Sequence, residues 1–192
     1  MASTSLIARK PFLAQLAEQS LAMRAMVVLL GSIVIAASSW IQVPMYPVPM
    51  TMQSCAIMLI GALCGRRLAA ETVGAFLLEG AIGLPVLAGG AGGLHYFWGP
   101  TAGYLFGYLV AAAAIGWLVE RGFARNLPKL VIAMLIGEVA IFGLGCLWLG
   151  ALFGAKVAIV SGLMPFLLGD AVKTAFAAAV ATGIGQFRQP RR

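Results

Sequence analysis

An acidic and a basic residue stand three positions apart in a stretch that is otherwise apolar, Pro165–Ala179, which reads PFLLGDAVKTAFAAA. On a helix, residues three positions apart lie on the same face, so Asp170 and Lys173 are expected to be neighbours. If the stretch lies in a membrane, each charge costs about 2.5–3.5 kcal/mol near a helix centre and marks a candidate functional site. A carboxylate acceptor beside an ammonium donor matches a ligand that presents N–H next to C=O, as in an amide or a urea. The alternative is a structural pair whose two charges merely offset each other.

Further polar and aromatic residues could complete a binding site around this pair. Gln53 follows a proline-rich segment and carries both donors and an acceptor. Glu138 stands near the middle of another apolar segment, where it could reach a ligand or a polar group of another helix. The aromatic residues suit an apolar ring or chain, and they include Tyr46, Tyr96, Phe97, Trp98 and Tyr104. These residue types together indicate a small, partly apolar solute with a polar head.

The composition indicates an all-α integral membrane protein. Of the 192 residues, 61% are hydrophobic and only 10% are charged, and the mean hydropathy is +0.98. Soluble domains carry about 25% charged residues, so this chain has too few to cover a globule exposed to water. No Asp, Glu, Lys or Arg occurs from Ala25 to Gly65, a run long enough for nearly two membrane spans. We therefore expect residues 1–192 to form a single membrane domain.

The chain lacks the motifs of several enzyme classes. It contains no G-x-x-x-x-G-K-[ST] sequence, so nucleotide hydrolysis by a phosphate-binding loop is excluded. The single histidine, His95, belongs to no cluster with metal-site spacing and has no serine or cysteine partner for nucleophilic catalysis. We accordingly expect no enzyme activity, no catalytic residue, no metal and no cofactor.

Six membrane-spanning helices are predicted after an amphipathic N-terminal lead-in, residues 1–20. The predicted spans are Leu21–Ile41, Thr51–Cys64, Leu68–Gly83, Thr101–Val119, Leu130–Leu149 and Ser161–Gln186, so that residues 21–187 form a six-helix bundle. Eleven of the thirteen Lys and Arg residues then fall on one side of the membrane. The positive-inside rule assigns that side, and with it both termini, to the cytoplasm.

The net charge and the loops fit this topology. The charge of +7 is accounted for by basic residues on the cytoplasmic side, which can contact anionic lipid, so binding of nucleic acid is not expected. The segments Gln42–Met50 and Leu84–Pro100 then face outward. They are nearly uncharged and rich in glycine, proline and aromatic residues, whereas loops that face water are usually more polar. We expect these outer loops to cap a ligand cavity.

Four motifs resemble those of a known family in their order and spacing: VPMYPVPMTMQ (Val43–Gln53), GAIGLPVLAGGAGG (Gly80–Gly93), GPTAGYLFGY (Gly99–Tyr108) and LLGDAVK (Leu167–Lys173). From about Leu29 to Phe187 the chain is similar to the BioY family, the biotin-specific S components of energy-coupling-factor (ECF) transporters. The family usually reads GPTGGY where Ala102 stands here. One extra methyl group should be tolerated at that position.

The resemblance implies a multi-pass protein of the bacterial inner membrane that captures biotin at its outer face. It implies that Asp170 and Lys173 hold polar groups of biotin, and that Gln53, Tyr104 and a glycine loop line the cavity. The candidate substrate-binding residues are therefore Asp170, Lys173, Gln53, Tyr104, Gly89, Gly90, Gly92, Gly93, Trp98 and Glu138.

The resemblance also implies partners, namely an ECF-type coupling subunit (EcfT) in the membrane and two ATPase subunits. Family members often carry Ala-x-x-x-Ala on the first helix for docking the coupling subunit. Here Ser32 and Ala36 have the same spacing. Small residues four positions apart permit two helices to approach closely, so these two residues are the candidate docking site.

Two other function classes are open at this stage. A stand-alone carrier or channel for another small solute would need a continuous polar path through the spans. A membrane-embedded enzyme would need a nucleophile, a metal or a proton-transfer pair with access to substrate. Retention of unchanged biotin by the purified protein, at one per chain, would separate biotin capture from both.

Overall fold

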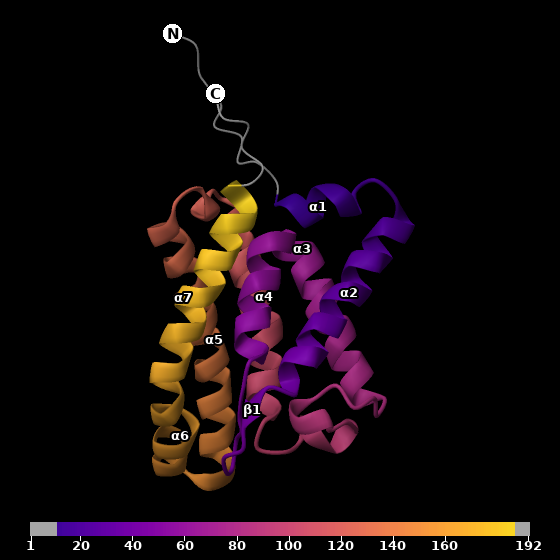
Figure 1. The fold of residues 1–192 in the computed structure, drawn as a ribbon. Helices are drawn as coiled ribbons and strands as arrows, with labels where there is room; N and C mark the ends of the chain where they lie inside the picture. The colour runs from indigo at the N-terminus through magenta and orange to yellow at the C-terminus, as the bar shows by residue number, and fades with distance from the viewer. Residues whose placement is uncertain (1–10, 187–192) are drawn as a thin grey trace.

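The structure is a computed structural model of the chain and describes residues 11–186. It is mostly helical, and a short N-terminal helix lies at one end of a bundle of long helices (Figure 1). The helices are α1 Phe12–Ala17, α2 Leu21–Ser39, α3 Gln53–Ala81, α4 Ala102–Glu120, α5 Leu127–Phe153, α6 Ala155–Gly162 and α7 Met164–Gln186. The connections contain the strands β1 Gln42–Val43 and β2 Met50–Thr51 and the 3₁₀ helices η1 Ala88–Gly90, η2 Leu94–Phe97 and η3 Phe123–Arg125.

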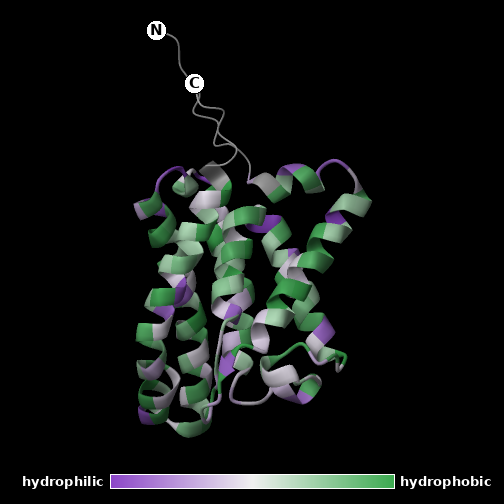
Figure 2. Cartoon of the chain, viewed as in Figure 1, coloured by the Kyte–Doolittle hydropathy of each residue, from purple (hydrophilic) through white to green (hydrophobic). Residues whose placement is uncertain are grey.

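Four of the described helices are long and apolar enough to cross a membrane: Leu21–Ser39, Ala102–Glu120, Leu127–Phe153 and Met164–Ile184. Their mean hydropathy lies between 1.4 and 2.4, and Figure 2 shows hydrophobic residues along most of their length. Helices of this length and hydropathy match the hydrocarbon core of a bilayer. The predicted helical membrane protein is thus confirmed at this level. The second and third predicted spans both correspond to α3, except for two residues at each end of that helix.

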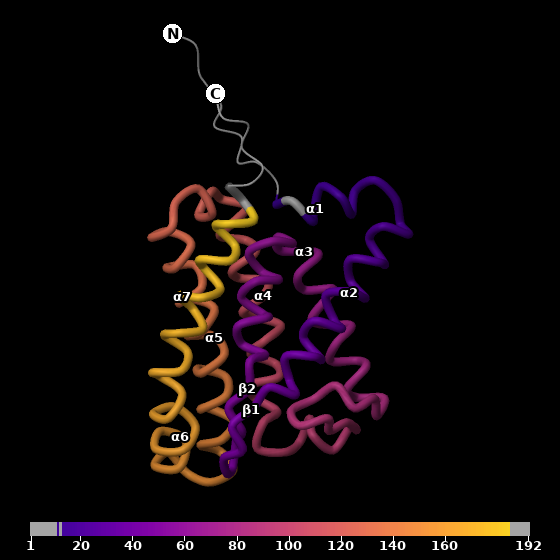
Figure 3. The backbone as a smooth tube through the Cα atoms, viewed as in Figure 1, coloured from indigo at the N-terminus to yellow at the C-terminus, as the bar shows by residue number. Residues whose placement is uncertain are grey.

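Two helical halves form α3, and they meet at Gly65, where φ is +74°. Residues with a side chain rarely adopt this conformation, so glycine permits the break. The N–H groups that begin the second half lack partners within the helix, and Arg66 N–H donates to Glu120 Oε1 of α4 at 2.8 Å. Gly116 of α4 packs against the same point, where a Cβ would overlap the backbone of Gly65 and Arg66. The chain reverses at this turn, as the smooth tube in Figure 3 shows.

Side-chain contacts show how the two halves of α3 pack. As residue numbers increase along the first half of α3, the numbers of the contacting residues increase along α7, so these two helical segments run parallel. The same holds for the second half of α3 and α2, which therefore also run parallel. The contact pairs are Ser54 with Asp170, Met58 with Thr174, Arg24 with Glu71, and Ser32 with Glu79. The first half of α3 therefore lies against α7, and the second half lies against α2.

The connections at one end of the bundle surround a β-hairpin, in which β1 pairs antiparallel with β2. The Leu84–Pro100 loop lies beside this hairpin, and Ser39 Oγ at the end of α2 donates to Leu87 O in the loop at 3.1 Å. We call this the hairpin end of the bundle. The opposite end contains α1, the Gly65 turn and the α4–α5 connection, and we call it the α1 end (Figure 1).

Parts of the predicted element boundaries differ from the structure. The segment before the last predicted span, which includes Lys156, forms α6 instead of a loop. Gly154, with φ of +87°, separates α6 from α5 and lets the apolar segment continue as a helix after a sharp turn. Of the predicted lead-in, residues 12–17 form α1, while residues 1–10 lie outside the described part of the chain. Residue 187, the predicted end of the bundle, also lies outside it.

Candidate functional site

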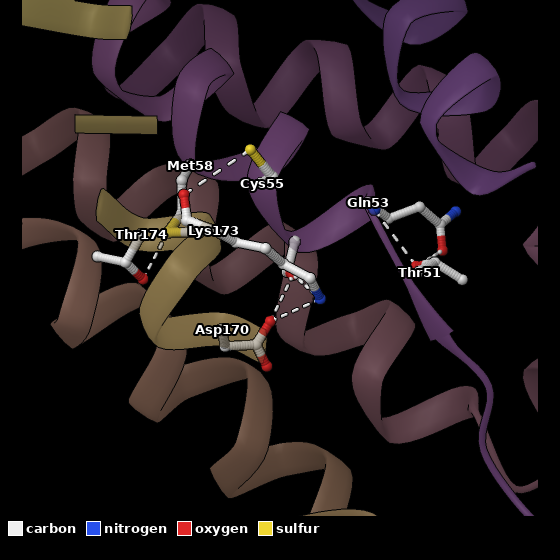
Figure 4. Close-up of polar contacts among 8 residues, drawn as sticks. Thr51, Gln53, Cys55, Met58, Asp170, Lys173 and Thr174 are labelled. Atoms are coloured by element: carbon white, nitrogen blue, oxygen red, sulfur yellow. Dashed lines mark hydrogen bonds and ion pairs between the residues drawn. The ribbon is translucent and has the colours of Figure 1, made fainter. Parts of the chain in front are cut away.

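The Asp170–Lys173 pair lies inside the bundle, in the part of α7 nearer the hairpin end. Lys173 Nζ donates to Asp170 Oδ1 at 2.7 Å, and the two side chains are 8% and 7% exposed. Ser54 of α3 completes the cluster, because its hydroxyl donates to Asp170 Oδ1 at 3.1 Å and accepts from Lys173 Nζ at 3.3 Å. Figure 4 shows the pair reaching from α7 toward α3. This polar cluster joins two helices and places an acceptor next to a donor.

Gln53 begins α3 and is held by Thr51, the residue that ends β2. Thr51 Oγ1 donates to Gln53 Oε1 at 3.1 Å and accepts from Gln53 N–H at 3.3 Å. Gln53 is 2% exposed, and within residues 11–186 its Nε2 has no hydrogen-bond partner. The side chain thus has a fixed acceptor end and an unused donor end.

A cavity of about 190 Å³ brings these polar groups together. Asp170, Lys173, Ser54 and Gln53 all line it. The loops of the hairpin end supply further lining residues, namely Pro47, Val48, Pro49, Leu87, Ala88, Tyr96 and Pro100. Small-molecule sites are typically apolar with a few convergent polar groups, and this cavity has that composition.

Aromatic residues form another part of the cavity wall. Tyr104, Phe142 and Phe166 lie 5.9–6.4 Å apart between ring centroids, with one stacked pair and two edge-on pairs. The Tyr104 hydroxyl is already occupied, because it donates to Gly162 O at 2.8 Å. Tyr104 therefore offers the cavity its ring, and it also fixes the α6–α7 junction against α4.

A larger cavity of about 710 Å³ lies at the α1 end, far along the bundle from the polar cluster. Charged and apolar residues of α1, α2, α3 and α4 line it, among them Arg24, Arg67 and Glu120. None of the substrate-binding residues predicted from the sequence lines this cavity. We therefore assign the candidate site to the smaller cavity at the hairpin end.

Comparison with known proteins places the chain in a family. Residues 10–189 match the BioY family. The chain belongs to this family. The biotin transporter BioY of Rhodobacter capsulatus is 41% identical over 157 residues, covering 74% of this chain and 82% of that protein. The biotin transporter BioY of Rhizobium etli is 38% identical over 147 residues, covering 72% and 78%.

The fold of this BioY-family chain is similar to that of a solved structure, the S component for biotin from an ECF-type ABC transporter. The TM-score is 0.78 at 27% sequence identity, and the match covers 86% of this chain and 92% of that one. The resemblance seen in the sequence motifs is thus confirmed. The relatives are transporters, which also confirms that the family is not one of enzymes.

Four of the substrate-binding residues predicted from the sequence line the cavity in this BioY-family chain: Asp170, Lys173, Gln53 and Tyr104. They come from α7, from the start of α3 and from α4, which are brought together by the parallel packing of α3 with α7. The other predicted substrate-binding residues, Glu138, Trp98 and the four glycines, do not line the cavity. The structural role of each is described below.

Glu138 of α5 is buried but does not line the cavity. It is 6% exposed, and neither carboxyl oxygen has a hydrogen-bond partner among the described residues. It lies within electrostatic range of Asp170 and Lys173. Ile141 and Phe142, about one turn along α5, are the α5 residues that line the cavity. Glu138 is thus close to the ion pair but lies off the cavity wall.

The four glycines of the Leu84–Pro100 loop fold the loop and do not line the cavity. Gly89, Gly90 and Gly93 have positive φ angles of 69°, 75° and 115°. At Gly92 a Cβ would overlap the backbone of Leu84 and Gly83. Their neighbours Leu87, Ala88 and Tyr96 carry the lining side chains. The glycines thus shape the loop that covers the cavity, rather than exposing backbone to its interior.

Trp98 belongs to the same loop, and it is 71% exposed. It is absent from the cavity wall, in contrast to Tyr96. Tryptophan is enriched at the interface between membrane and water, and Trp98 fits that environment at the hairpin end. The sequence alone did not distinguish the two aromatic residues, because their directions depend on the η2 turn that contains Tyr96.

The predicted docking residues of α2 face different surroundings. Ser32 is fully buried, and its hydroxyl donates to Glu79 Oε1 of α3 at 2.9 Å. Ser32 therefore packs α2 against α3 within this chain. Ala36 is half-buried and packs against the core. Large apolar residues, including Leu29, Leu30, Ile33 and Val34, form the exposed part of α2.

Sequence reasoning missed several residues of the site. Ser54, which bridges the ion pair, is 116 residues from Asp170 in the sequence, so no local pattern indicates the contact. Phe166 could have been found, because it stands four positions before Asp170 and shares its helix face. Phe142 joins the wall only through the packing of α5 on α4 and α7.

Proposed function

We propose that this BioY-family chain captures biotin and serves as the substrate-binding component of a biotin uptake system. The observation that carries the proposal is the cavity that combines the Asp170–Lys173–Ser54 cluster with an aromatic wall. The relatives named biotin transporters support it, as does the similarity to the S component for biotin. Here Asp170, Lys173, Gln53 and Tyr104 are the proposed substrate-binding residues.

Biotin fits the chemistry of this cavity. Its ureido ring presents two N–H groups beside one C=O, and the Asp170 carboxylate and the Lys173 ammonium supply the complementary acceptor and donor. Its thiophane ring and hydrocarbon tail are apolar, and Tyr104, Phe142 and Phe166 offer aromatic surface to them. Hydrogen bonds to charged groups are worth about 1.5–3 kcal/mol net, so the cluster supplies much of the specificity.

For the orientation in the membrane, we propose six crossings with both termini in the cytoplasm of a bacterial cell. The two halves of α3, which reverse at Gly65, add two crossings to the four long spans. Basic residues gather at the α1 end, where they would meet cytoplasmic water and anionic lipid; they are Arg24, Arg66, Arg67, Arg121, Arg125 and Lys129. The hairpin end and its cavity would then face outward, where biotin arrives. The chain would reside in the inner membrane.

For the partners, we propose a coupling subunit of the EcfT type and two ATPase subunits. The support is the relation to an S component that comes from an ECF-type ABC transporter. Ala36 is retained as a docking position on α2, together with the exposed apolar face of that helix. The uptake of biotin would then draw on ATP hydrolysed by the partners.

The test is retention and affinity of biotin in protein purified from membranes in detergent. We expect one unchanged biotin per chain and tight rebinding after it is removed. Protein that shows a cooperative thermal unfolding transition, and is therefore folded, but binds no biotin would contradict the proposal. Reconstitution of the chain alone into vesicles, with labelled biotin outside, then separates capture from transport: capture without accumulation supports a need for the partner subunits.

A further inference from the structure

The larger cavity, of about 710 Å³, lies at the α1 end and takes no part in the site at the hairpin end. Its lining residues come from α1, from the start of α2, from the Gly65 turn of α3 and from the end of α4. Figure 1 shows α1 lying across this end of the bundle. A volume of this size is within the range of small-molecule sites. The cavity therefore has room for a ligand of the size of a lipid head group.

The cavity lies where a membrane-spanning helix begins. Ser20 caps α2, because its side chain accepts from Met23 N–H at 3.0 Å, and the apolar span starts at Leu21. Both Ser20 and Leu21 line the cavity. The ends of an apolar span of this length meet the head groups of a bilayer. The cavity is thus at the level of the head groups, whichever side of the membrane the α1 end faces.

Part of the cavity wall is apolar and continues onto the exposed surface of α2. Cys64 and Leu68 are buried residues of this wall. Leu21 also lines the cavity, yet it is 82% exposed. Further along α2 the exposed residues are large and apolar, namely Met26, Leu29, Leu30, Ile33 and Val34. A ligand with its polar head in the cavity can therefore extend hydrocarbon chains along α2.

Positive charge is in excess on the wall that α2 and α3 form. Arg24 donates to both carboxylate oxygens of Glu71, and Arg67 approaches the same carboxylate at 3.4 Å. Two guanidinium groups thus share one carboxylate. The side chain of Arg67 is 85% exposed and makes no hydrogen bond to residues 11–186. Its donors are therefore available to a phosphate, which guanidinium groups bind well.

Negative charge is present on the walls that α4 and α1 form. Glu120 Oε1, at the end of α4, accepts from Arg66 N–H at 2.8 Å, where Gly65 interrupts α3. A bond to a neutral backbone group leaves the charge of Glu120 in place, and the residue is exposed. Glu18 of α1 adds a second carboxylate to the wall. The cavity therefore offers a place for an ammonium group as well as a place for a phosphate.

We propose that this cavity binds the head group of an aminophospholipid, which carries a phosphate and a primary ammonium. Arg67 donates to the phosphate, Arg24 adds its charge, and Glu120 accepts from the ammonium. The acyl chains lie against the exposed apolar residues of α2. A purely anionic head group has no partner for Glu120, and a quaternary ammonium has no N–H to donate to it.

The experiment measures lipid binding to the full chain, purified in detergent and freed of lipid. Phosphatidylethanolamine, phosphatidylcholine and phosphatidylglycerol with the same acyl chains are added to the micelles at equal mole fraction. Native mass spectrometry counts the bound lipids, and the melting temperature of the protein measures how much each lipid stabilises it. The water-soluble head group O-phosphoethanolamine is tested separately.

We expect one tightly bound phosphatidylethanolamine per chain. It should raise the melting temperature by about 3–6 °C when its concentration is about tenfold above its dissociation constant. Phosphatidylcholine and phosphatidylglycerol should bind about three- to tenfold more weakly. O-phosphoethanolamine should not stabilise the protein at the same concentration, because it lacks the chains that bury apolar surface of α2.

Two variants test the two charges separately. Arg67→Met should weaken the binding of all three lipids by about three- to tenfold, because each carries a phosphate. Glu120→Gln keeps an oxygen for Arg66 N–H but removes the charge, so phosphatidylethanolamine should bind only as well as phosphatidylcholine. Arg125→Met is the matched control for Arg67→Met, because Arg125 is exposed at the same end but does not line the cavity. If Glu120→Gln does not fold, Arg67→Met beside Arg125→Met still tests the phosphate contact.

Three outcomes would overturn the inference. Equal stabilisation by the three lipids, unchanged in Arg67→Met, would show that lipid only surrounds the bundle. A preference for phosphatidylglycerol would show that the cavity takes an anion without a contact to Glu120. Equal stabilisation by O-phosphoethanolamine would assign the cavity to a soluble phosphate compound instead of a membrane lipid.

Discussion

Two ion pairs in this chain differ in what they connect. Arg24 and Glu71 are 47 positions apart and join α2 to the second half of α3 at the α1 end, with Arg67 also near Glu71 at 3.4 Å. Asp170 and Lys173 stand on the same helix, so their bond by itself ties no two elements together. The first pair has the position of a structural contact. Ser54 of α3 bonds the second pair to another helix, and this pair faces the cavity.

Their surroundings differ as well. The side chains of Arg24 and Glu71 are 34% and 33% exposed, so water and salt screen the attraction. Those of Asp170 and Lys173 are 8% exposed or less, which adds a desolvation cost that a pair in water does not have. Replacing a buried pair by apolar residues is often neutral or even stabilising. The position of the costly pair on the cavity wall favours a role in ligand binding over a role in stability, and the variants below test this.

The largest expected effects are those of Asp170→Asn and Lys173→Met, which test the binding role of the buried pair. Each variant should bind biotin about ten- to a hundredfold more weakly, because a hydrogen bond to a charged group is worth about 1.5–3 kcal/mol. Isothermal titration on purified protein measures the affinity for biotin, and the yield of purified protein shows whether each variant folds. The double variant should lose less binding free energy for biotin than the sum of the losses in the two single variants, since the two groups act as a unit.

A purely structural pair would give another pattern in the same measurements. The single variants would fold poorly because each leaves a buried charge unpaired. The double variant would recover its yield, and the folded fraction of all three would bind biotin with near-normal affinity. In that case both ion pairs, Arg24–Glu71 and Asp170–Lys173, would be structural contacts.

A smaller effect is expected for Ser54→Ala, which removes the bridge between α3 and the buried pair. Asp170 and Lys173 keep their bond to each other without Ser54, so biotin affinity should fall less than in the variants of the pair itself, by about two- to tenfold. Ser38→Ala is a matched control, because the Ser38 hydroxyl donates to Ile35 O of its own helix and lies off the cavity wall. Equal affinity in both variants would show that Ser54 does not orient the pair toward the ligand.

The contrast between local and distant contacts also decides how much could be predicted from the sequence. The Asp170–Lys173 pair was predictable because both residues lie on one helix, where a spacing of three sets the geometry. The helices were predictable from apolar runs, but α6 was missed because Gly154 separates it from α5 by a single-residue turn. Ser54 and Phe142 belong to other helices, so only tertiary packing reveals them.

The glycine loop illustrates the same limit. Its glycines were expected to line the cavity, whereas in the structure they provide positive φ angles and close packing within the loop. The side chains that line the cavity from this loop are those of Leu87, Ala88 and Tyr96. A run of glycines indicates a sharply folded loop, but it does not tell which neighbouring residues face inward.

A still smaller effect on affinity is expected for Glu138→Gln. Glu138 is buried near the ion pair but lies off the cavity wall, and glutamine keeps its shape. Biotin affinity should change by less than about threefold, a free-energy difference below about 0.7 kcal/mol. Isothermal titration of biotin into the Glu138→Gln and Asp170→Asn variants in the same buffer compares their affinities. A tenfold loss would restore Glu138 to the binding site and would mean that biotin reaches deeper along α5 than the cavity described here.

The smallest expected effect on biotin binding is that of Arg24→Met, which breaks the ion pair at the α1 end. The variant should bind biotin with wild-type affinity, because Arg24 and the cavity lie at opposite ends of the bundle. Its melting temperature in detergent should fall by a few degrees at most, since pairs exposed to water contribute little. Raising the salt concentration should reduce the difference from wild type, because salt already screens the pair in the native protein.

Arg67→Met is the control for Arg24→Met, because Arg67 also approaches Glu71 but its side chain is 85% exposed. Its effect on the melting temperature should be smaller than that of Arg24→Met, because the more exposed charge is screened more strongly. If Arg24→Met instead weakened biotin binding as much as Lys173→Met does, the two ends of the bundle would be energetically coupled. Such coupling would make the α2–α3 contact part of the binding mechanism, and the pair at the α1 end could no longer be called structural.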